Sequence, residues 1–339
     1  MSFKTIICLA SVAVAFSAPA AVKNPPKINW GGSALKFLAE NVYGVRPQFD
    51  GFKPMAEVVK TEELAELNAV KKTVRLNTVT QLGETSFEAV GYFPEKAGRS
   101  PVFLYLAFRD PNDLKNDRWP VKMILERGCA TVAFRYGDVL KDDPKVFDGI
   151  TRPENGWGAI STWALAASRV ADYLVTDAQV DTNRIAIVGL SRMGKTCLWA
   201  GANDGRFALV CPTCSGLFGA RMACRNLYGE TIDQITTNFP HWFAPKCRTQ
   251  YAGKDNELPF DQHWLLASVS PRMLVIGSAD EDWWACPSGE MSGWEYASEA
   301  WARQGRGNLT FHMRHGKHDI TAEDWKAYLD FAEEKGWMK

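Results

Sequence analysis

The 339-residue sequence lacks an excess of charge of either sign, because 39 lysines and arginines balance 39 aspartates and glutamates. Nucleic acids and anionic membranes attract proteins through clustered positive charge, so this balance argues against both as partners. Low-complexity and strongly charged segments are also missing, and an apolar fraction of 46% is enough to bury a large core. The sequence therefore predicts a globular protein that needs no nucleic acid and no membrane for its function.

Long hydrophobic runs are missing too, apart from a short one at the N-terminus. Lys4 precedes an apolar run at 5–16, and small residues follow at 17–21. A bilayer-spanning helix needs about 20 apolar residues, whereas a short run followed by small residues is typical of a cleavable secretory signal. We expect a signal peptide over residues 1–20, with cleavage after Ala20 or, as the alternative, after Ala18. The mature protein is then secreted or periplasmic.

Cysteine pairs that would indicate a zinc ribbon are absent as well. The CxxC pair at 211–214 has no second CxxC pair to accompany it. Removal of Cys8 with the signal peptide leaves seven of the eight cysteines, so at least one thiol stays free or bonds outside the chain. Up to three disulfides are allowed, and we expect Cys197 to be buried on a helix.

No internal repeat and no polar linker divides the sequence, which favours a single domain over residues 21–339. Residues 22–54 are rich in Pro, Gly and Asn and indicate an irregular lead-in, and alternating patches at 56–93 predict antiparallel strands. Short apolar runs then alternate with helical patterns. The expected strands are 102–106, 129–134, 184–189, 207–211, 272–277 and 309–313, and the expected helices are 121–127, 157–175 and 195–202. Continuous apolar strands that alternate with helices predict an α/β fold, with a mostly parallel central sheet and helices on both faces, as in α/β-hydrolases.

The turn at 189–195 carries the strongest chemical signal. Its sequence, GLSRMGK, joins an expected strand to an expected helix and places Ser191 at the turn. Such a tight turn pushes the serine hydroxyl out at the carboxyl edge of the sheet, beside the positive end of the helix, while flanking glycines relieve crowding. This is the nucleophile elbow of α/β-hydrolases with one departure, because the second glycine lies three residues after the serine.

The same residues also satisfy the spacing of a phosphate-binding P-loop, with Gly189, Gly194, Lys195 and Thr196 in the required places. A P-loop normally opens its domain and is followed by an apolar strand that ends in a magnesium-binding Asp. Here the turn comes after at least two strands of parallel type, and an exported protein meets little ATP. The nucleophile elbow is therefore the better interpretation.

A serine nucleophile needs a base, and α/β-hydrolases supply the partners in the chain order Ser, acid, His. The five histidines include His312, His315 and His318 near the C-terminus. His318 lies deepest in the loop after the last expected strand, where the base belongs. The HxxHxxH spacing of these three also matches a metal site, but period three on an extended strand sends side chains to opposite faces, so a metal site is disfavoured.

The acid is expected after the preceding strand, where Asp280, Glu281 and Asp282 follow one another. Its role is to hold the imidazole in the right tautomer and to stabilise the imidazolium. The distance from Gly277 by itself favours Asp280 slightly, and the residues alone leave the choice open.

Taken together, several motifs resemble glucuronoyl esterases, which are carbohydrate esterase family fifteen. The matching segments are 189–195, 198–202, 229–231, 239–243, 258–263, 278–284 and 316–321. The resemblance implies a serine esterase that hydrolyses esters of (4-O-methyl-)glucuronic acid, as in the links between lignin alcohols and xylan. It also implies that Ser191 is the nucleophile and His318 the base, and that Arg192 contributes its N–H and its charge to the oxyanion hole.

The resemblance extends to the acid and to the sugar contacts. Bacterial members take the acid from the position of Asp282, whereas fungal members use a Glu where this chain has Thr213 or Cys214. The resemblance therefore favours Asp282 over Asp280. Contacts with the uronate are implied for three residues, Lys195, Glu230 and Trp284.

This chemistry requires no metal and no organic cofactor, and we expect a monomer whose partner is a glucuronoxylan or lignin–carbohydrate ester. Two alternatives come from other readings of the same residues. One is an acetyl or methyl esterase acting on other plant polysaccharide esters. The other is a sugar-binding protein without catalytic activity on a hydrolase fold.

Overall fold

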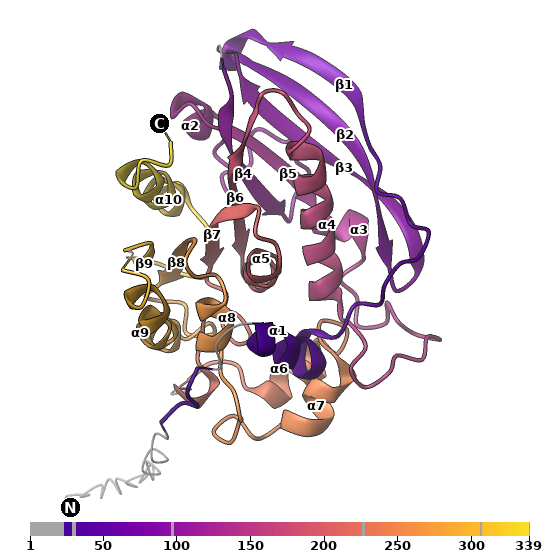
Figure 1. Cartoon of the computed structure of the whole chain (residues 1–339), viewed down its shortest axis with the longest axis vertical. Coiled ribbons are helices and arrows are strands. Elements are labelled where there is room, and N and C mark those ends of the chain that lie inside the picture. The colour runs from indigo at the N-terminus through magenta and orange to yellow at the C-terminus, as the bar shows by residue number, and fades with distance from the viewer. Residues whose placement is uncertain (1–23, 29–31, 96–97, 226–227, 306, 339) are drawn as a thin grey trace, which may run out of the picture.

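The computed structural model describes residues 24–28, 32–95, 98–225, 228–305 and 307–338. Nine strands of these residues form one sheet, in the order β1-β2-β3-β5-β4-β6-β7-β8-β9. The pairs from β5 to β9 are parallel, whereas β1, β2, β3 and β5 pair in antiparallel fashion. In Figure 1 the purple strands β1–β3 form the edge of the sheet that lies farthest from β8 and β9.

The strands have these bounds: β1 (Ala56–Leu64), β2 (Ala69–Thr80), β3 (Gly83–Pro94), β4 (Ser100–Ala107), β5 (Ala130–Arg135), β6 (Val180–Leu190), β7 (Phe207–Thr213), β8 (Met273–Ala279) and β9 (Leu309–Arg314). The α-helices are α1 (Gly32–Leu38), α2 (Val121–Glu126), α3 (Tyr136–Val139), α4 (Ala159–Leu174), α5 (Arg192–Asn203), α6 (Ile232–Asn238), α7 (Pro245–Tyr251), α8 (His263–Ala267), α9 (Pro287–Ala302) and α10 (Ala322–Glu334). The described residues also form the π-helix η1 (Ala39–Tyr43) and the 3₁₀-helices η2 (Ala65–Leu67) and η3 (Ala223–Arg225).

Helices cover both faces of the parallel part of the sheet. Every residue of β4 is buried, because its side chains alternate between two cores. Leu104 packs in the core that also contains residues of α1, α4, α5 and α8. Phe103 and Tyr105 point to the other core, together with Ile124 of α2 and Trp325 of α10. The mostly parallel sheet with helices on both faces confirms the α/β-hydrolase fold that the apolar runs predict.

The lead-in is more regular than the composition of residues 22–54 suggests. It contains α1 and η1, and Leu38, Val42 and Tyr43 are fully buried. The ring of Tyr43 stacks on Trp199 of α5 with 4.2 Å between centroids, and its hydroxyl donates to the carbonyl of Phe218 at 2.8 Å. The expectation of an irregular lead-in was therefore wrong for residues 32–43, because their apolar side chains pack into the core and Tyr43 covers α5. The proposed signal peptide lies outside the described residues.

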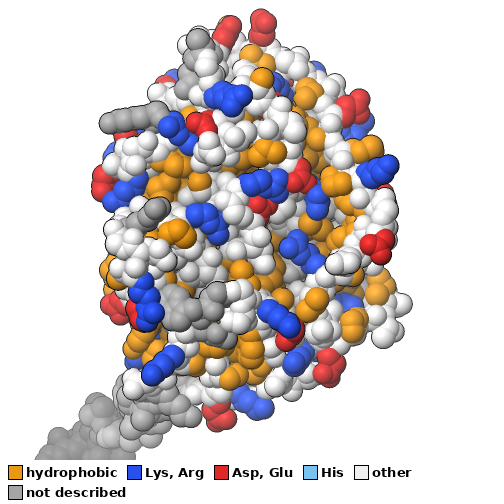
Figure 2. Space-filling model, viewed as in Figure 1, with side chains coloured by type: hydrophobic (Ala, Val, Ile, Leu, Met, Phe, Trp, Pro, Cys, Tyr) orange, Lys and Arg blue, Asp and Glu red, His pale blue; other side chains and the backbone are white. Residues whose placement is uncertain are grey.

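The cysteines, the helices and the surface charges give three further properties of the described residues. The seven cysteines of the described residues are all buried, Cys197 on α5 among them, and Cys197, Cys211, Cys214, Cys224, Cys247 and Cys286 are free thiols. No helix within the described part is long and apolar enough to cross a membrane. Figure 2 shows basic and acidic side chains interspersed over the face in view.

Candidate active site

Ser191 lies in the turn between β6 and α5, at the carboxyl edge of the sheet. Its φ is +59°, in the left-handed region that side chains rarely adopt. The turn is closed by close backbone contacts: a Cβ on Gly189 would lie 2.1 Å from the carbonyl oxygen of Met193, and one on Gly194 would lie 2.8 Å from the Cβ of Ser215. The glycine at 194 is thus needed, because the first turn of α5 passes directly over the loop that follows β7.

His318 and Asp282 follow the next strands along the same edge, β9 and β8. Nδ1 of His318 lies 2.6 Å from Oδ2 of Asp282, whose side chain is only 1% exposed. Asp280 instead accepts the N–H of Gly316 at 2.9 Å and faces His315 at 3.1 Å, on the surface. The structure therefore brings Asp282, and not Asp280, to the imidazole of His318.

The other two histidines of the HxxHxxH sequence turn elsewhere. Nε2 of His312 is 3.5 Å from Asp324, and His315, whose side chain is 82% exposed, faces Asp280. Each of the three imidazoles thus faces a different carboxylate, and the three do not converge on one point.

Cys214 adds a third polar group beside Asp282 and His318. One possible ligand atom from each of the three lies within 4.8 Å of the others, so the group could surround a metal ion. Burial raises the pKa of the Cys214 thiol well above its usual value, so the group is a neutral thiol in the protein as it stands. Burial would also raise the pKa of Asp282, but the hydrogen bond and charge of His318, the N–H of Ala285 and the Cys214 thiol outweigh it, so this pKa lies below its usual range. Asp282 is therefore held as a carboxylate beside the imidazole.

The Ser191 hydroxyl and the His318 imidazole share a pocket, although no hydrogen bond joins them. The pocket, called the Ser191 pocket below, has a volume of about 180 Å³. It is lined by Ser191, Arg192, Lys195, Cys214, Ser215, Gly216, Glu230, Phe239, Trp242, Trp284, Ala285 and His318. Hydrogen bonds between nucleophile and base are often long in free enzymes and tighten with substrate. The volume is below the roughly 300–1,000 Å³ of sites for drug-sized ligands, so the pocket fits one ring rather than a chain.

Arg192, the first residue of α5, is fixed by one carboxylate and by aromatic rings. Its Nη1 forms an ion pair with Asp142 and lies 3.3 Å from the hydroxyl of Tyr136. Its guanidinium lies 5.1 Å from the ring centre of Trp242 and 5.6 Å from that of Phe108. No described residue forms a hydrogen bond with Nη2, so this donor stays available to a ligand.

Asp142 serves as the common acceptor of this cluster. Its Oδ1 accepts hydrogen bonds from Nε2 of His241 and Nε1 of Trp242, both at 2.7 Å, while Oδ2 pairs with Arg192. Burial would raise the pKa of Asp142, but the hydrogen bonds and the Arg192 charge outweigh it and hold the pKa far below its usual value. The Tyr136 hydroxyl also donates to Oδ2, at 3.1 Å. Asp142 is thus an anion at neutral pH, oriented by four donors.

Lys195 and Glu230 place opposite charges on another wall of the pocket. Lys195 is buried and its Nζ donates to the carbonyl of Ser215 at 2.6 Å. Burial lowers the pKa of Lys195 to about 8 in spite of the nearby Glu230. Burial also raises the pKa of Glu230, although Lys195 and Arg221 oppose this shift. Oε1 of Glu230 is buried without a partner among the described residues, which suits it to accept a hydroxyl of a bound ligand.

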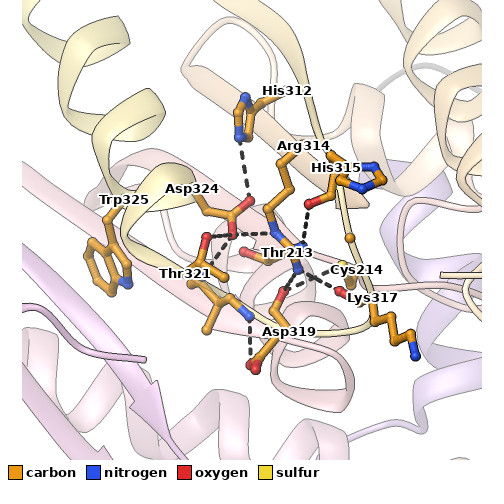
Figure 3. A network of polar contacts seen from close by, with 12 residues as sticks. Thr213, Cys214, His312, Arg314, His315, Lys317, Asp319, Thr321, Asp324 and Trp325 are labelled. Atoms are coloured by element: carbon orange, nitrogen blue, oxygen red, sulfur yellow. Dashed lines mark hydrogen bonds and ion pairs between the residues drawn. The ribbon is translucent and has the colours of Figure 1, made fainter. Parts of the chain in front are cut away.

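The loop that carries His318 is clamped by a buried arginine. Figure 3 shows Arg314, at the end of β9, surrounded by acceptors from this loop and from α10. Its Nη2 donates to the carbonyls of Lys317 at 2.7 Å and Asp319 at 2.6 Å, the two neighbours of His318. Its Nε donates to the fully buried Asp324 at 2.9 Å. Arg314 thereby fixes the backbone on both sides of the imidazole.

Sequence reasoning missed Asp142 and Arg314. Asp142 is followed by a second aspartate, Asp143, and the sequence alone does not show which of the two is buried and which is exposed. Arg314 ends a strand, where a charged residue normally faces solvent. The presence of His241 and Trp242 in one of the matching segments was the only available pointer to the Arg192 cluster.

Comparisons with known proteins agree with this fold. The family model described as "Glucuronyl esterase, fungi" matches residues 79–305. Carbohydrate esterase MZ0003, from an unknown prokaryotic organism, is 34% identical, with 78% of this chain and 75% of that protein covered. The solved structure of a glucuronoyl esterase from Solibacter usitatus has a TM-score of 0.81 and 30% identity, covering 89% of this chain and 91% of that one. The 4-O-methyl-glucuronoyl methylesterase of Podospora anserina is 32% identical, but the match spans 46% of this chain and 36% of that protein.

The fold and the chemistry of these relatives define a carboxylic ester hydrolase of the α/β-hydrolase class. Within that class the chain belongs to the glucuronoyl esterase family, carbohydrate esterase family fifteen. The resemblance inferred from the sequence motifs is thus confirmed.

Arg314→Lys tests the clamp on the His318 loop. Lysine keeps a positive charge near Asp324 but lacks the fork of donors that reaches both carbonyls, so we expect a loss of about 2 kcal/mol in the free energy of unfolding. We also expect faster amide hydrogen exchange at 315–320. Chemical denaturation and exchange measured by mass spectrometry check both expectations.

The matched control is Arg75→Lys, which changes an exposed ion pair with Glu88 on the antiparallel part of the sheet. Exposed pairs contribute at most about 1 kcal/mol, so little should change. Unaltered exchange at 315–320 in Arg314→Lys would contradict the clamp.

Proposed function

We propose that the protein is an exported serine esterase that hydrolyses esters of glucuronic acid and 4-O-methylglucuronic acid through a Ser191–His318–Asp282 triad. The observation that supports this most is the 2.6 Å contact between His318 and the buried Asp282, beside a serine held at positive φ in a nucleophile elbow. Membership of the glucuronoyl esterase family supports the substrate class.

The first half of the reaction transfers the uronoyl group to the enzyme. His318 takes the proton of the Ser191 hydroxyl while the oxygen attacks the ester carbonyl. Asp282 holds the imidazole in the tautomer with hydrogen on Nδ1 and stabilises the imidazolium. The tetrahedral intermediate then collapses, the alcohol leaves with the proton from His318, and the uronoyl group stays on Ser191 as an ester.

The second half releases the acid. A water molecule gives a proton to His318 and attacks the acyl-enzyme, and Ser191 leaves with that proton. In both halves a negative charge develops on the former carbonyl oxygen. The N–H of Arg192 is free of helical hydrogen bonding because it is the first residue of α5. With the Nη2 donor of its guanidinium, it would stabilise this charge, and such donors are worth roughly 10²–10³ in kcat each.

Sugar recognition falls to Lys195, Glu230 and Trp284, which line the Ser191 pocket. Lys195 and Glu230 offer a buried donor and a buried acceptor to the uronate hydroxyls. Trp284, which is 50% exposed, gives a flat wall against the apolar face of the ring. Because pyranose rings combine both kinds of surface, the pocket suits one uronate residue.

The natural substrate we propose is the ester between a lignin alcohol and the glucuronic acid side group of xylan. A signal peptide over residues 1–20 would bring the enzyme out of the cytoplasm, where such polymers are met. No cofactor enters any step, since the triad and the arginine supply the nucleophile, the base and the counter-charge.

The direct test is Ser191→Ala. Loss of the nucleophile should lower kcat on methyl glucuronate ester by at least about 10³-fold, while the unfolding temperature stays the same. Initial rates and a thermal melt measure both, with the surface variant Ser298→Ala as the control.

Substrate class is tested with the wild-type protein on methyl glucuronate, methyl galacturonate and acetylated xylan. The proposal expects the glucuronate ester to react fastest. Preferred release of acetate would support the alternative polysaccharide esterase, and full activity in Ser191→Ala would defeat the serine mechanism.

Asp142→Asn tests the positioning of Arg192. The asparagine amide keeps the shape but removes the charge and turns a donor toward Arg192, so the guanidinium loses its fixed position. We expect kcat to fall roughly tenfold to a hundredfold with a smaller change in KM. Asp143→Asn removes the same charge from an exposed neighbour and should leave the kinetics unchanged. Equal kinetics in the two variants would show that Asp142 does not position Arg192.

The ionisation of Lys195 should determine how kcat/KM changes at alkaline pH. Its pKa of about 8 means that the ammonium is present below that pH and is lost as the pH rises through it. The value of kcat/KM on methyl glucuronate should therefore fall above pH about 8, once spontaneous hydrolysis is subtracted. In Lys195→Met the value should be lower at every pH, and this limb should vanish. Persistence of the same limb in Lys195→Met would assign it to another group.

A further inference from the structure

Trp283 is a large apolar residue whose side chain is mostly exposed to solvent. Among the described tryptophans it is the most exposed, at 67%, whereas most of the others lie in the core. It stands in the sequence between Asp282 and Trp284, and Trp284 lines the Ser191 pocket. Its ring packs on one side against Tyr228, with 5.1 Å between centroids and 55° between planes, and its remaining surface faces solvent.

The two rings are held in place by the backbone beneath them. The N–H of Glu230 donates to the carbonyl of Trp284 at 3.4 Å. A Cβ on Gly229, whose φ is +96°, would lie 2.6 Å from that same carbonyl oxygen, so the chain at 228–230 lies directly on the chain at 283–284. The Tyr228 hydroxyl is 3.3 Å from Oγ of Ser288 on α9. Trp283 and Tyr228, called the Trp283 platform below, are therefore fixed relative to the pocket.

The small pocket leaves most of a polymeric substrate outside. Its volume of about 180 Å³ suits a single ring, so any group attached to the uronate must lie on the rim. The carbonyl end of the uronate is directed to Ser191 and Arg192, and the alcohol it carries would meet the rings around Arg192. The platform instead adjoins Glu230 and Trp284, in sequence and through backbone contacts, at the end of the pocket that binds the sugar hydroxyls.

We propose that the Trp283 platform is a second sugar subsite, which stacks the pyranose ring linked to the uronate of the substrate. An indole presents a flat apolar surface that matches the C–H face of a pyranose, and burying both removes apolar area from water. This subsite rests on the proposed function, because that function directs the ester carbonyl to Ser191.

Trp283→Ala tests the subsite when three substrates are compared. These are methyl glucuronate, benzyl glucuronate, and the methyl ester of a glucuronic acid linked to a xylo-oligosaccharide. The wild type should have a lower KM on the oligosaccharide ester than on methyl glucuronate. Trp283→Ala should raise that KM about threefold to tenfold, the range expected for one aromatic contact, with kcat unchanged. It should leave both monosaccharide esters unaffected.

The controls separate this subsite from other roles of Trp283. Tyr228→Ala should reproduce the effect in weaker form, and Leu82→Ala, which truncates an exposed apolar side chain on the β2–β3 turn, should show none. An equal loss on all three substrates would mean that Trp283 supports Asp282, and a loss confined to the benzyl ester would assign the platform to the alcohol. Either result overturns the subsite.

If the protein is not a glucuronoyl esterase, the experiment gives a different result from the one expected when only the subsite is wrong. In that case the wild type would not hydrolyse methyl glucuronate at all. Tryptophan fluorescence titrated with the free glucuronosyl xylo-oligosaccharide, which needs no turnover, then judges the subsite alone. A quench that Trp283→Ala removes supports it, and identical titrations of the two proteins overturn it.

Discussion

The contact between His318 and Asp282 is the interaction on which the rest of the site depends. It joins the loops after β9 and β8, two neighbouring parallel strands, and it is 2.6 Å long because both loops are held from outside. Arg314 fixes the carbonyls on either side of His318, and burial keeps the Asp282 carboxylate away from solvent. Since parallel strands end at one edge, the elbow after β6 presents Ser191 to the same pocket.

Charge inside the site is arranged in compensated pairs. A buried guanidinium or ammonium is costly unless an anion lies close to it. Asp142 forms an ion pair with Arg192 and compensates its charge. The charge of Lys195 is compensated by two carboxylates, Glu230 in the pocket and the buried Glu290. Glu290 in turn accepts hydrogen bonds from Ser278 at 2.6 Å and from the N–H of Gly216 at 2.8 Å. The charges of Lys195 and Arg192 are thus compensated by separate anions.

The sequence predicts the sheet well and the helices between its later strands poorly. Strands such as β4 are buried on both faces, so their apolar runs are continuous and easy to recognise. The helix α9 was not predicted, because the buried face of its first two turns carries Gly289, Glu290 and Gly293, and Trp301 near its end is its one large buried apolar residue. The turn motif pointed to Ser191 and the chain order of α/β-hydrolases to His318, whereas the choice of Asp282 came from the family resemblance. Asp142 was beyond reach, because its partners come together only through the fold.

Reaction with a serine-directed phosphonate, with the adduct located by mass spectrometry, tests the central claim most directly. The reagent reacts only with a hydroxyl that a neighbouring base activates. The account predicts one adduct per chain, on Ser191, and a rate that falls sharply in His318→Ala. An adduct on another residue, or an unchanged rate without the imidazole, would contradict it.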